Sequence, residues 1–155
     1  MDNETIITIE GLKKHFPMGS GRFTALNGID LTVGKGEFAG IIGPSGSGKT
    51  TLLNIIGTLD VPSEGRAVIL GQSVAGLTPA ASAALRKSKL GFIFQSYNLF
   101  QVHTVFENVE FPLLLQGIET ARRRQMVLDA LEWVGLTDKI KSRPAQLSGG
   151  ESQRV

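Results

Sequence analysis

The sequence predicts an α/β fold, because strand-like and helix-like segments alternate along its first half and helices follow. Residues 5–10 and 25–33 alternate apolar and polar side chains, which is typical of β-strands. Residues 37–42 and 51–56 are short apolar runs on either side of a glycine-rich loop, which indicates a strand followed by a helix. With 155 residues, 41% of them hydrophobic, the chain is long enough to form a packed core.

The next elements alternate in the same way. Residues 66–70 form a short, mostly apolar run that predicts a strand after a turn. Thr78 precedes a proline, which is the usual start of a helix, and we expect this helix to reach about Lys87. Residues 90–94 form another apolar run, and we expect a strand that ends at Gln95.

Beyond this point the sequence predicts mainly helix. Thr104 and Glu107 have the spacing of a capping box, which marks a helix N-terminus. Residues 119–134 place apolar side chains on one helical face, and Gly135 is expected to end that helix. The basic run at residues 122–124 is interpreted as a solvated helix face rather than a binding patch.

The glycine-rich loop, Gly-Pro-Ser-Gly-Ser-Gly-Lys-Thr at residues 43–50, matches the phosphate-binding pattern G-x-x-x-x-G-K-[ST] at every fixed position. Glycines let many backbone N–H groups approach a triphosphate, and the following helix directs its N-terminus at the phosphates. We therefore expect a nucleoside triphosphate site, with Lys49 at the β- and γ-phosphates and Thr50 on Mg²⁺. The expected contacts are Gly43, Ser45, Gly46, Ser47, Gly48, Lys49, Thr50 and Thr51.

Residues 147–154, Leu-Ser-Gly-Gly-Glu-Ser-Gln-Arg, form a second motif. This motif resembles the signature of ATP-binding cassette (ABC) transporter ATPases, and the phosphate loop, Gln95 and this motif stand in that family's order. Residues 57–65, 92–99 and 107–113 are similar to one branch, which contains the lipoprotein-release (LolD-like) and macrolide or peptide export (MacB-like) ATPases.

The resemblance implies an α/β P-loop NTPase fold of the ABC-ATPase type, with an N-terminal antiparallel β part and a helical subdomain. Residues 1–95 are expected to form the β part and P-loop core, and residues 96–147 the helical subdomain. Residues 148–155 are expected to hold the signature motif and the start of its helix.

The resemblance also implies a head-to-tail dimer with a second ATPase subunit, bound to an integral membrane transporter subunit. ATP and Mg²⁺ would lie between the phosphate loop of one subunit and Ser148, Gly149 and Gly150 of the other. Gln95 would contact Mg²⁺ and the attacking water, so that Lys49 and Gln95 are the expected catalytic residues. Without the resemblance, Gln95 would be interpreted as an ordinary polar residue at the end of a strand.

Adenine is usually held in this family by an aromatic ring in an early loop. Phe16 matches that position best, counting back from residues 25–26, and His15 and Phe23 are alternatives. A flat apolar ring is sufficient for stacking, although a core or turn-packing role for Phe16 remains open.

Composition restricts the remaining function classes. The chain has no cysteine and a formal net charge of +2, and no basic face or aromatic platform indicates a nucleic-acid partner. No apolar run has the length of a membrane span, and the N-terminus lacks a signal-peptide pattern, so we expect a cytoplasmic protein. The resemblance implies that a membrane partner holds it at the inner face of the cell membrane. His103 and Trp133 are interpreted as a loop residue and a helix-packing residue.

The family's chemistry requires residues that this sequence does not contain. After the signature we expect an apolar strand ending in a Mg²⁺-binding Asp, then a Glu that polarises water, and later a switch His. The sequence stops at Val155, and neither Asp138 nor Glu151 ends an apolar strand. We therefore expect a truncated chain with an incomplete core sheet, which alone is poorly folded and inactive.

The favoured function is the ATP-binding subunit of an ABC transporter, which couples ATP binding and hydrolysis to export of a lipoprotein, macrolide or peptide. One alternative is a soluble ABC ATPase without a membrane partner. Another is a non-catalytic, truncated remnant. The transported substrate is not defined by the sequence.

Overall fold

The computed structural model describes residues 4–155. The chain divides into two compact units, Met1–Gly91 and Phe92–Val155, and each has its own cluster of buried apolar side chains. None of the helices within residues 4–155 combines the length and the apolar character that a membrane crossing requires.

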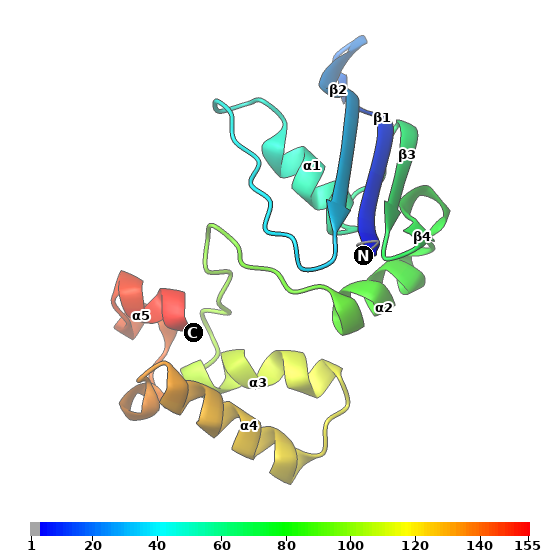
Figure 1. Cartoon of the computed structure of the whole chain (residues 1–155). Coiled ribbons are helices and arrows are strands. Elements are labelled where there is room, and N and C mark those ends of the chain that lie inside the picture. Colours follow the sequence, from blue (N-terminus) through cyan, green and yellow to red (C-terminus); the bar gives the residue numbers. More distant parts are fainter. Residues whose placement is uncertain (1–3) are drawn as a thin grey trace. The chain divides into compact units, whose positions relative to one another are not determined.

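The first unit is built on one antiparallel sheet (Figure 1). Its strands are β1 (Thr5–Met18), β2 (Gly21–Gly34), β3 (Glu64–Ile69) and β4 (Gln72–Ser73), in the order β2-β1-β3-β4. The strands β1 and β2 form a hairpin that extends farther than the alternating runs predicted, with Met18 paired to Gly21 across its tip. Three breaks in regular register occur between Ile9 and His15, where β-bulges change which side chains share a face.

Helix α1 (Lys49–Ile56) covers one face of this sheet. The buried side chains of this helix are Leu52 and Ile55. They pack against apolar side chains of the sheet, namely Ile9, Leu12, Leu26, Ala67 and Ile69. Burial of apolar surface is the main source of folding free energy, so this cluster fixes the helix and therefore the loop that precedes it.

Helix α2 (Pro79–Lys89) follows a short 3₁₀ turn, Val74–Gly76. The backbone N–H of Ala81 donates to the Thr78 hydroxyl at 3.2 Å, which confirms the predicted cap. Arg86 donates to the carbonyl oxygen of Thr58 at 2.6 Å and so joins α2 to the turn that follows α1.

The strands predicted over residues 37–42 and 90–94 do not form in this structure, so these two predictions were wrong. A strand in a parallel sheet needs a hydrogen-bonded neighbour, and no segment within residues 4–155 pairs with either of them. Phe38, Ile42 and Ile93 are fully exposed as a result. The sheet of the described chain is thus wholly antiparallel, which confirms the expected N-terminal antiparallel β part.

The second unit is helical. Helices α3 (Val105–Leu115) and α4 (Thr120–Trp133) pack around Val105, Val127, Leu131 and Leu136, which are all buried. The predicted capping box is present at α3, since Thr104 and Glu107 exchange side-chain and backbone hydrogen bonds. Two 3₁₀ turns, Thr137–Lys139 and Pro144–Gln146, lead to α5 (Gly149–Arg154).

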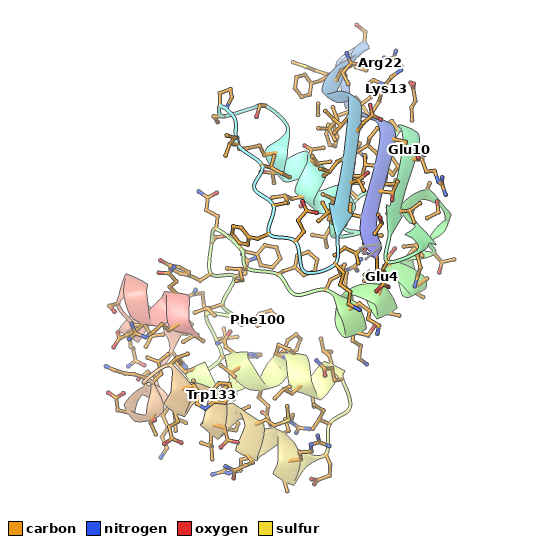
Figure 2. The ribbon with its side chains drawn as sticks, viewed as in Figure 1. Glu4, Glu10, Lys13, Arg22, Phe100 and Trp133 are labelled. Carbon is orange, nitrogen blue, oxygen red and sulfur yellow. The ribbon has the colours of Figure 1, made fainter. Side chains whose placement is uncertain are left out.

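Two interpretations of exposed and packed side chains on α4 need correction. Arg123 is not solvated with its neighbours, because its Nε donates to Glu110 on α3 at 2.7 Å and its side chain is only 13% exposed. Trp133 does not pack between helices, because it lies at the end of α4 with 89% of its surface exposed (Figure 2). Helical periodicity alone did not distinguish these two positions from their neighbours.

Candidate functional site

The phosphate-loop motif, residues 43–50, follows segment 37–42 and ends in the first turn of α1, in the first unit. Gly48 caps α1 with φ of 90°, a left-handed conformation that a side chain rarely adopts. A Cβ atom at this position would lie 2.5 Å from the carbonyl oxygen of Ala25 and 2.8 Å from Cδ2 of Leu26. The close approach braces the end of the loop against β2, and only glycine permits it.

The loop also presents unused backbone donors. Within the described chain, the N–H groups of Gly46, Gly48, Lys49 and Thr50 donate to no protein acceptor. The first N–H groups of a helix have no intrahelical partner, and an anion at the helix N-terminus can accept from them. The donor set of this loop therefore fits a phosphate group.

The Lys49 side chain folds back onto the loop that precedes it. Its Nζ donates to the carbonyl oxygens of Gly43 at 2.8 Å and Pro44 at 2.7 Å, and it lies 3.5 Å from the Ser47 hydroxyl. An ammonium forms stronger hydrogen bonds with a phosphate than with neutral carbonyl groups, so these contacts are exchangeable for a bound anion.

A cation at this site would depend on hydroxyl and phosphate oxygens. No cluster of three or more His, Cys, Asp or Glu side chains suited to a metal occurs within residues 4–155. Thr50 is exposed in the first turn of α1, so its hydroxyl is open to a ligand, and Thr51 beside it is half-buried. One hydroxyl together with phosphate oxygens is a donor set that suits Mg²⁺, which keeps several waters.

Phe16 and Phe23, two alternatives for the adenine contact, lie side by side in the sheet. They are direct cross-strand partners in the β1–β2 hairpin, and both rings are partly exposed. Lys14, two residues before Phe16, directs its Nζ over the Phe16 ring at 5.1 Å from the centroid. Directly opposed residues lie on the same face of a sheet, so the two rings are parts of one exposed aromatic surface.

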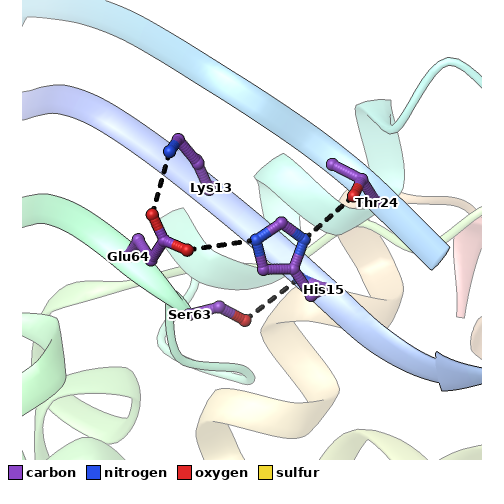
Figure 3. Close-up of polar contacts among 5 residues, drawn as sticks. All are labelled: Lys13, His15, Thr24, Ser63 and Glu64. Carbon is purple, nitrogen blue, oxygen red and sulfur yellow. Dashed lines mark hydrogen bonds and ion pairs between the residues drawn. The ribbon is translucent and has the colours of Figure 1, made fainter. Parts of the chain in front are cut away.

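His15, the third alternative, lies on the opposite face of β1 from Phe16, because successive side chains of a strand alternate between faces. There it takes part in a network of polar contacts (Figure 3). Its Nδ1 lies 3.0 Å from the Thr24 hydroxyl, and its Nε2 lies 3.4 Å from Oε1 of Glu64. The other Glu64 oxygen accepts from Lys13 at 2.9 Å, and these contacts lower the pKa of Glu64, the hydrogen bond from Lys13 most of all. The His15 ring is thus occupied by a polar network, away from the aromatic surface.

The signature motif forms the N-terminus of α5 in the second unit. The Glu151 N–H donates to the Ser148 hydroxyl at 3.2 Å, and the Ser148 N–H donates to the Glu151 carboxylate at 2.7 Å. The hydrogen bond from the Ser148 backbone is the main cause of a lowered pKa at Glu151. The Ser148 hydroxyl acts here as an acceptor and keeps its own proton to donate, and Gly149 and Gly150 beside it are exposed.

Gln95 also belongs to the second unit, where it is exposed in a bend. The structure therefore places the phosphate loop and Phe16 in one unit, and Gln95 with the signature residues in the other. Lys14 and Asp60 were not selected by the sequence analysis. These two residues form an ion pair, and the Lys14 ammonium faces the Phe16 ring. A lone lysine and a lone aspartate 46 positions apart give no pattern that would reveal this pairing.

The sequence matches the profile of the ABC transporter family over residues 26–155. It is 45% identical, over 150 residues, to the macrolide export ATP-binding/permease protein MacB 1/2 of Paracoccus denitrificans, which covers 97% of this chain and 22% of that protein. It is 43% identical, over 153 residues, to the lipoprotein-releasing system ATP-binding protein LolD of Pseudoalteromonas translucida, which covers 99% of this chain and 66% of that protein.

A solved structure gives the same likeness. The dimeric post-hydrolysis structure of the ATP-binding cassette MJ0796, bound to ADP and Pi, superimposes with a TM-score of 0.87 and 38% sequence identity. The match covers 96% of this chain and 66% of that one. The chain thus spans from 22% to 66% of the lengths of these relatives.

Proposed function

This chain belongs to the ABC transporter ATP-binding family, close to its MacB and LolD members, and from that premise we propose that it powers export through a membrane partner. The transported molecule would be a lipoprotein or a macrolide, as the names of the relatives suggest, or a peptide, as the resemblance to this branch implies. The observation that carries the proposal is the phosphate loop, in which Gly48 is braced against β2 and Lys49 stands beside unused N–H donors.

In the proposed complex, the adenine ring of ATP stacks on Phe16 and Phe23. The loop N–H groups and Lys49 bind the β- and γ-phosphates, and the Thr50 hydroxyl and Gln95 hold the cation. Mg²⁺, when bound, would supply positive charge that neutralises the phosphate groups. The donors at the α1 end of the loop are held by the contact of Gly48 with β2, and donors held in place before a reaction stabilise developing charge without reorganising.

The site is completed by a second ATPase subunit in this proposal. Ser148, Gly149 and Gly150 present a hydroxyl proton and helix N-terminal N–H groups, which suit the γ-phosphate of ATP held by the partner. The dimeric state of the MJ0796 cassette supports such an arrangement. The membrane subunit would hold the pair at the cytoplasmic face of the membrane.

Residues 1–155 by themselves are proposed not to hydrolyse ATP. The expected Mg²⁺-binding Asp and water-polarising Glu would follow an apolar strand. The two carboxylates considered near the signature, Asp138 and Glu151, do not stand in that position. Asp138 lies in a 3₁₀ turn, and Glu151 is held by the backbone of Ser148. Phosphate release that is abolished by Lys49→Ala would show this part of the proposal to be wrong.

Calorimetric titration of the chain with MgATP tests the binding site. Lys49→Ala is expected to weaken binding by about 10- to 100-fold, the range for losing a charged hydrogen bond to a phosphate. Lys35→Ala is the matched control, because Lys35 is an exposed lysine of the same unit paired with Glu4 at 3.0 Å. Equal affinities for the Lys49 and Lys35 variants, or a folded chain that binds no MgATP, would contradict the proposal.

A further inference from the structure

Lys14 is the one charged residue that is buried in the described part of the chain. Its Nζ donates to Oδ1 of Asp60 at 2.5 Å and to the carbonyl oxygen of Val61 at 2.8 Å. The side chains of Lys14 and Asp60 are 10% and 28% exposed, so solvent screens this ion pair only weakly. A buried charge requires such partners, because burial without them is costly.

Asp60 is itself held by helix α1. The N–H groups of Leu59 and Asp60 donate to the carbonyl oxygen of Asn54, at 2.8 Å and 3.3 Å, in the turn that ends the helix. Asp60 Oδ1 also accepts from the N–H of Val61 at 2.7 Å, which fixes the orientation of the carboxylate. The ion pair thus joins β1 to the helix whose other end carries the phosphate loop.

The same ammonium faces the Phe16 ring, 5.1 Å from its centroid. Successive side chains alternate along β1, so Lys14 and Phe16 lie on one face, while Lys13 and His15 meet Glu64 on the other. A cation over an aromatic face attracts the ring, and a ring restrained before binding loses less freedom when a ligand stacks on it.

We propose that the Lys14–Asp60 ion pair is a positioning device, which fixes the Phe16 ring for adenine and links it to the helix of the phosphate loop. The inference rests on the proposed function, because it assigns Lys14 and Asp60 a role in the ATP site. Neither residue is catalytic in this inference. They act on the base through Phe16.

Two ligands separate positioning from a purely structural role. MgATP uses both Phe16 and the phosphate loop, whereas magnesium tripolyphosphate uses the loop alone. Asp60→Asn keeps the shape of the side chain but removes its charge, and it is expected to weaken MgATP binding by about three- to tenfold. Its affinity for tripolyphosphate should stay within about twofold of the unmodified chain, since the loop contacts are unchanged.

Further variants complete the test. Lys14→Met should lose as much MgATP affinity as Asp60→Asn, and Lys14→Arg should restore most of it, because the charge over the ring is kept. Lys13→Met is the matched control on the same strand, where the lysine pairs with Glu64 on the other face. Combining Asp60→Asn with Phe16→Ala should add no further loss, because the ion pair acts through the ring.

The outcomes distinguish this inference from the proposed function. If Phe16→Ala weakens MgATP binding and Asp60→Asn does not, the inference fails and the proposed function stands. Equal losses for MgATP and tripolyphosphate would assign the pair a structural role only. If the unmodified chain binds neither ligand, both proposals fail.

A measurement without nucleotide tests the positioning itself. The Lys14 ε-methylene protons should show an upfield ring-current shift in nuclear magnetic resonance spectra, which Phe16→Ala removes and Asp60→Asn reduces. An unchanged shift in Asp60→Asn would overturn the positioning role.

Discussion

The α-carbon of Gly48 lies so close to the carbonyl oxygen of Ala25 that a Cβ atom would be 2.5 Å from that oxygen. Ala25 belongs to β2, and Gly48 is the cap of α1, so this contact joins the antiparallel sheet to the phosphate loop. Because the obstacle is backbone, it cannot move aside as the end of a flexible side chain would.

Gly48→Ala is therefore expected to destabilise the first unit and weaken MgATP binding. Overlap with β2 adds about 1–3 kcal/mol to the strain of a left-handed residue, which is itself about 1–2 kcal/mol. Gly46→Ala is the matched control, because Gly46 also has a positive φ of 79° but no atom within 4 Å of an added Cβ. Denaturant unfolding measures the free energy of unfolding of the two variants. Equal losses of stability in Gly48→Ala and Gly46→Ala would mean that the contact with Ala25 is unimportant.

Helix α3 should weaken in acid through its capping box. Hydrogen bonds from the Thr104 N–H at 2.6 Å and its hydroxyl at 2.8 Å lower the pKa of Glu107 below its ordinary 4.5. A carboxylate with a lowered folded-state pKa stabilises the fold above about pH 4.5 and loses that effect as the pH falls through the folded-state pKa.

Amide hydrogen exchange in α3 between pH 7 and pH 3 measures this effect, after correction for the intrinsic exchange rate. Glu107→Gln should abolish the acid-dependent part of the protection, whereas Glu132→Gln, at an exposed position of α4, should retain it. An identical pH profile for Glu107→Gln and the unmodified chain would show that the box does not titrate with folding.

The ion pair between Arg123 and Glu110 should contribute to the stability of the second unit. Arg123 also donates to the carbonyl oxygen of Ile118 at 2.7 Å, so its removal leaves two acceptors without a partner. Arg123→Met is expected to cost about 1–3 kcal/mol, while Arg122→Met, at the exposed neighbouring position, should change stability by less than about 0.5 kcal/mol. Thermal unfolding of the two variants makes the comparison, and similar midpoints would contradict it.

Ser148 caps α5 and is proposed to contact the nucleotide of a partner subunit, and two substitutions separate these roles. Ser148→Ala removes the cap and should cost about 1 kcal/mol of local helix stability. Ser148→Asp keeps a good cap but places a negative charge toward the γ-phosphate, so it should keep the helix and abolish ATP-dependent dimerisation. Sedimentation with ATP and EDTA measures the dimer, and undiminished association of Ser148→Asp would exclude the contact.

Local chemistry explains which features could be predicted from the sequence. The caps at Thr78, Thr104 and Ser148 depend on side chains only a few positions apart, so their patterns are visible in the sequence and the structure contains all three. The strands expected over residues 37–42 and 90–94 depend on neighbours elsewhere, and apolar content alone does not supply a partner.

The aromatic surface shows the same limit for a site. Its three alternatives, His15, Phe16 and Phe23, could be selected as residue types, but which of them share a face depends on the register of the β1–β2 hairpin, which is broken three times between Ile9 and His15. A one-residue change in register turns a side chain to the other face, and glycines mark only two of these breaks: Gly11 in β1 and Gly28 in β2 have positive φ, whereas Ala25 stands at the third. The pairing of Lys14 with Asp60 was hidden for the related reason that it follows from tertiary packing alone.

The unpaired segment before the phosphate loop has a thermodynamic consequence. Residues 38–42 make no backbone hydrogen bond within the described chain, so the loop is braced at α1 and has no such support at its other end. A strand that pairs with this segment would order the loop in advance and reduce the entropy lost when nucleotide binds. The coupling free energy between two equilibria is the same in both directions, so bound nucleotide favours that strand pairing to the same degree. Strand pairing at residues 38–42 and nucleotide binding at the loop are then linked equilibria.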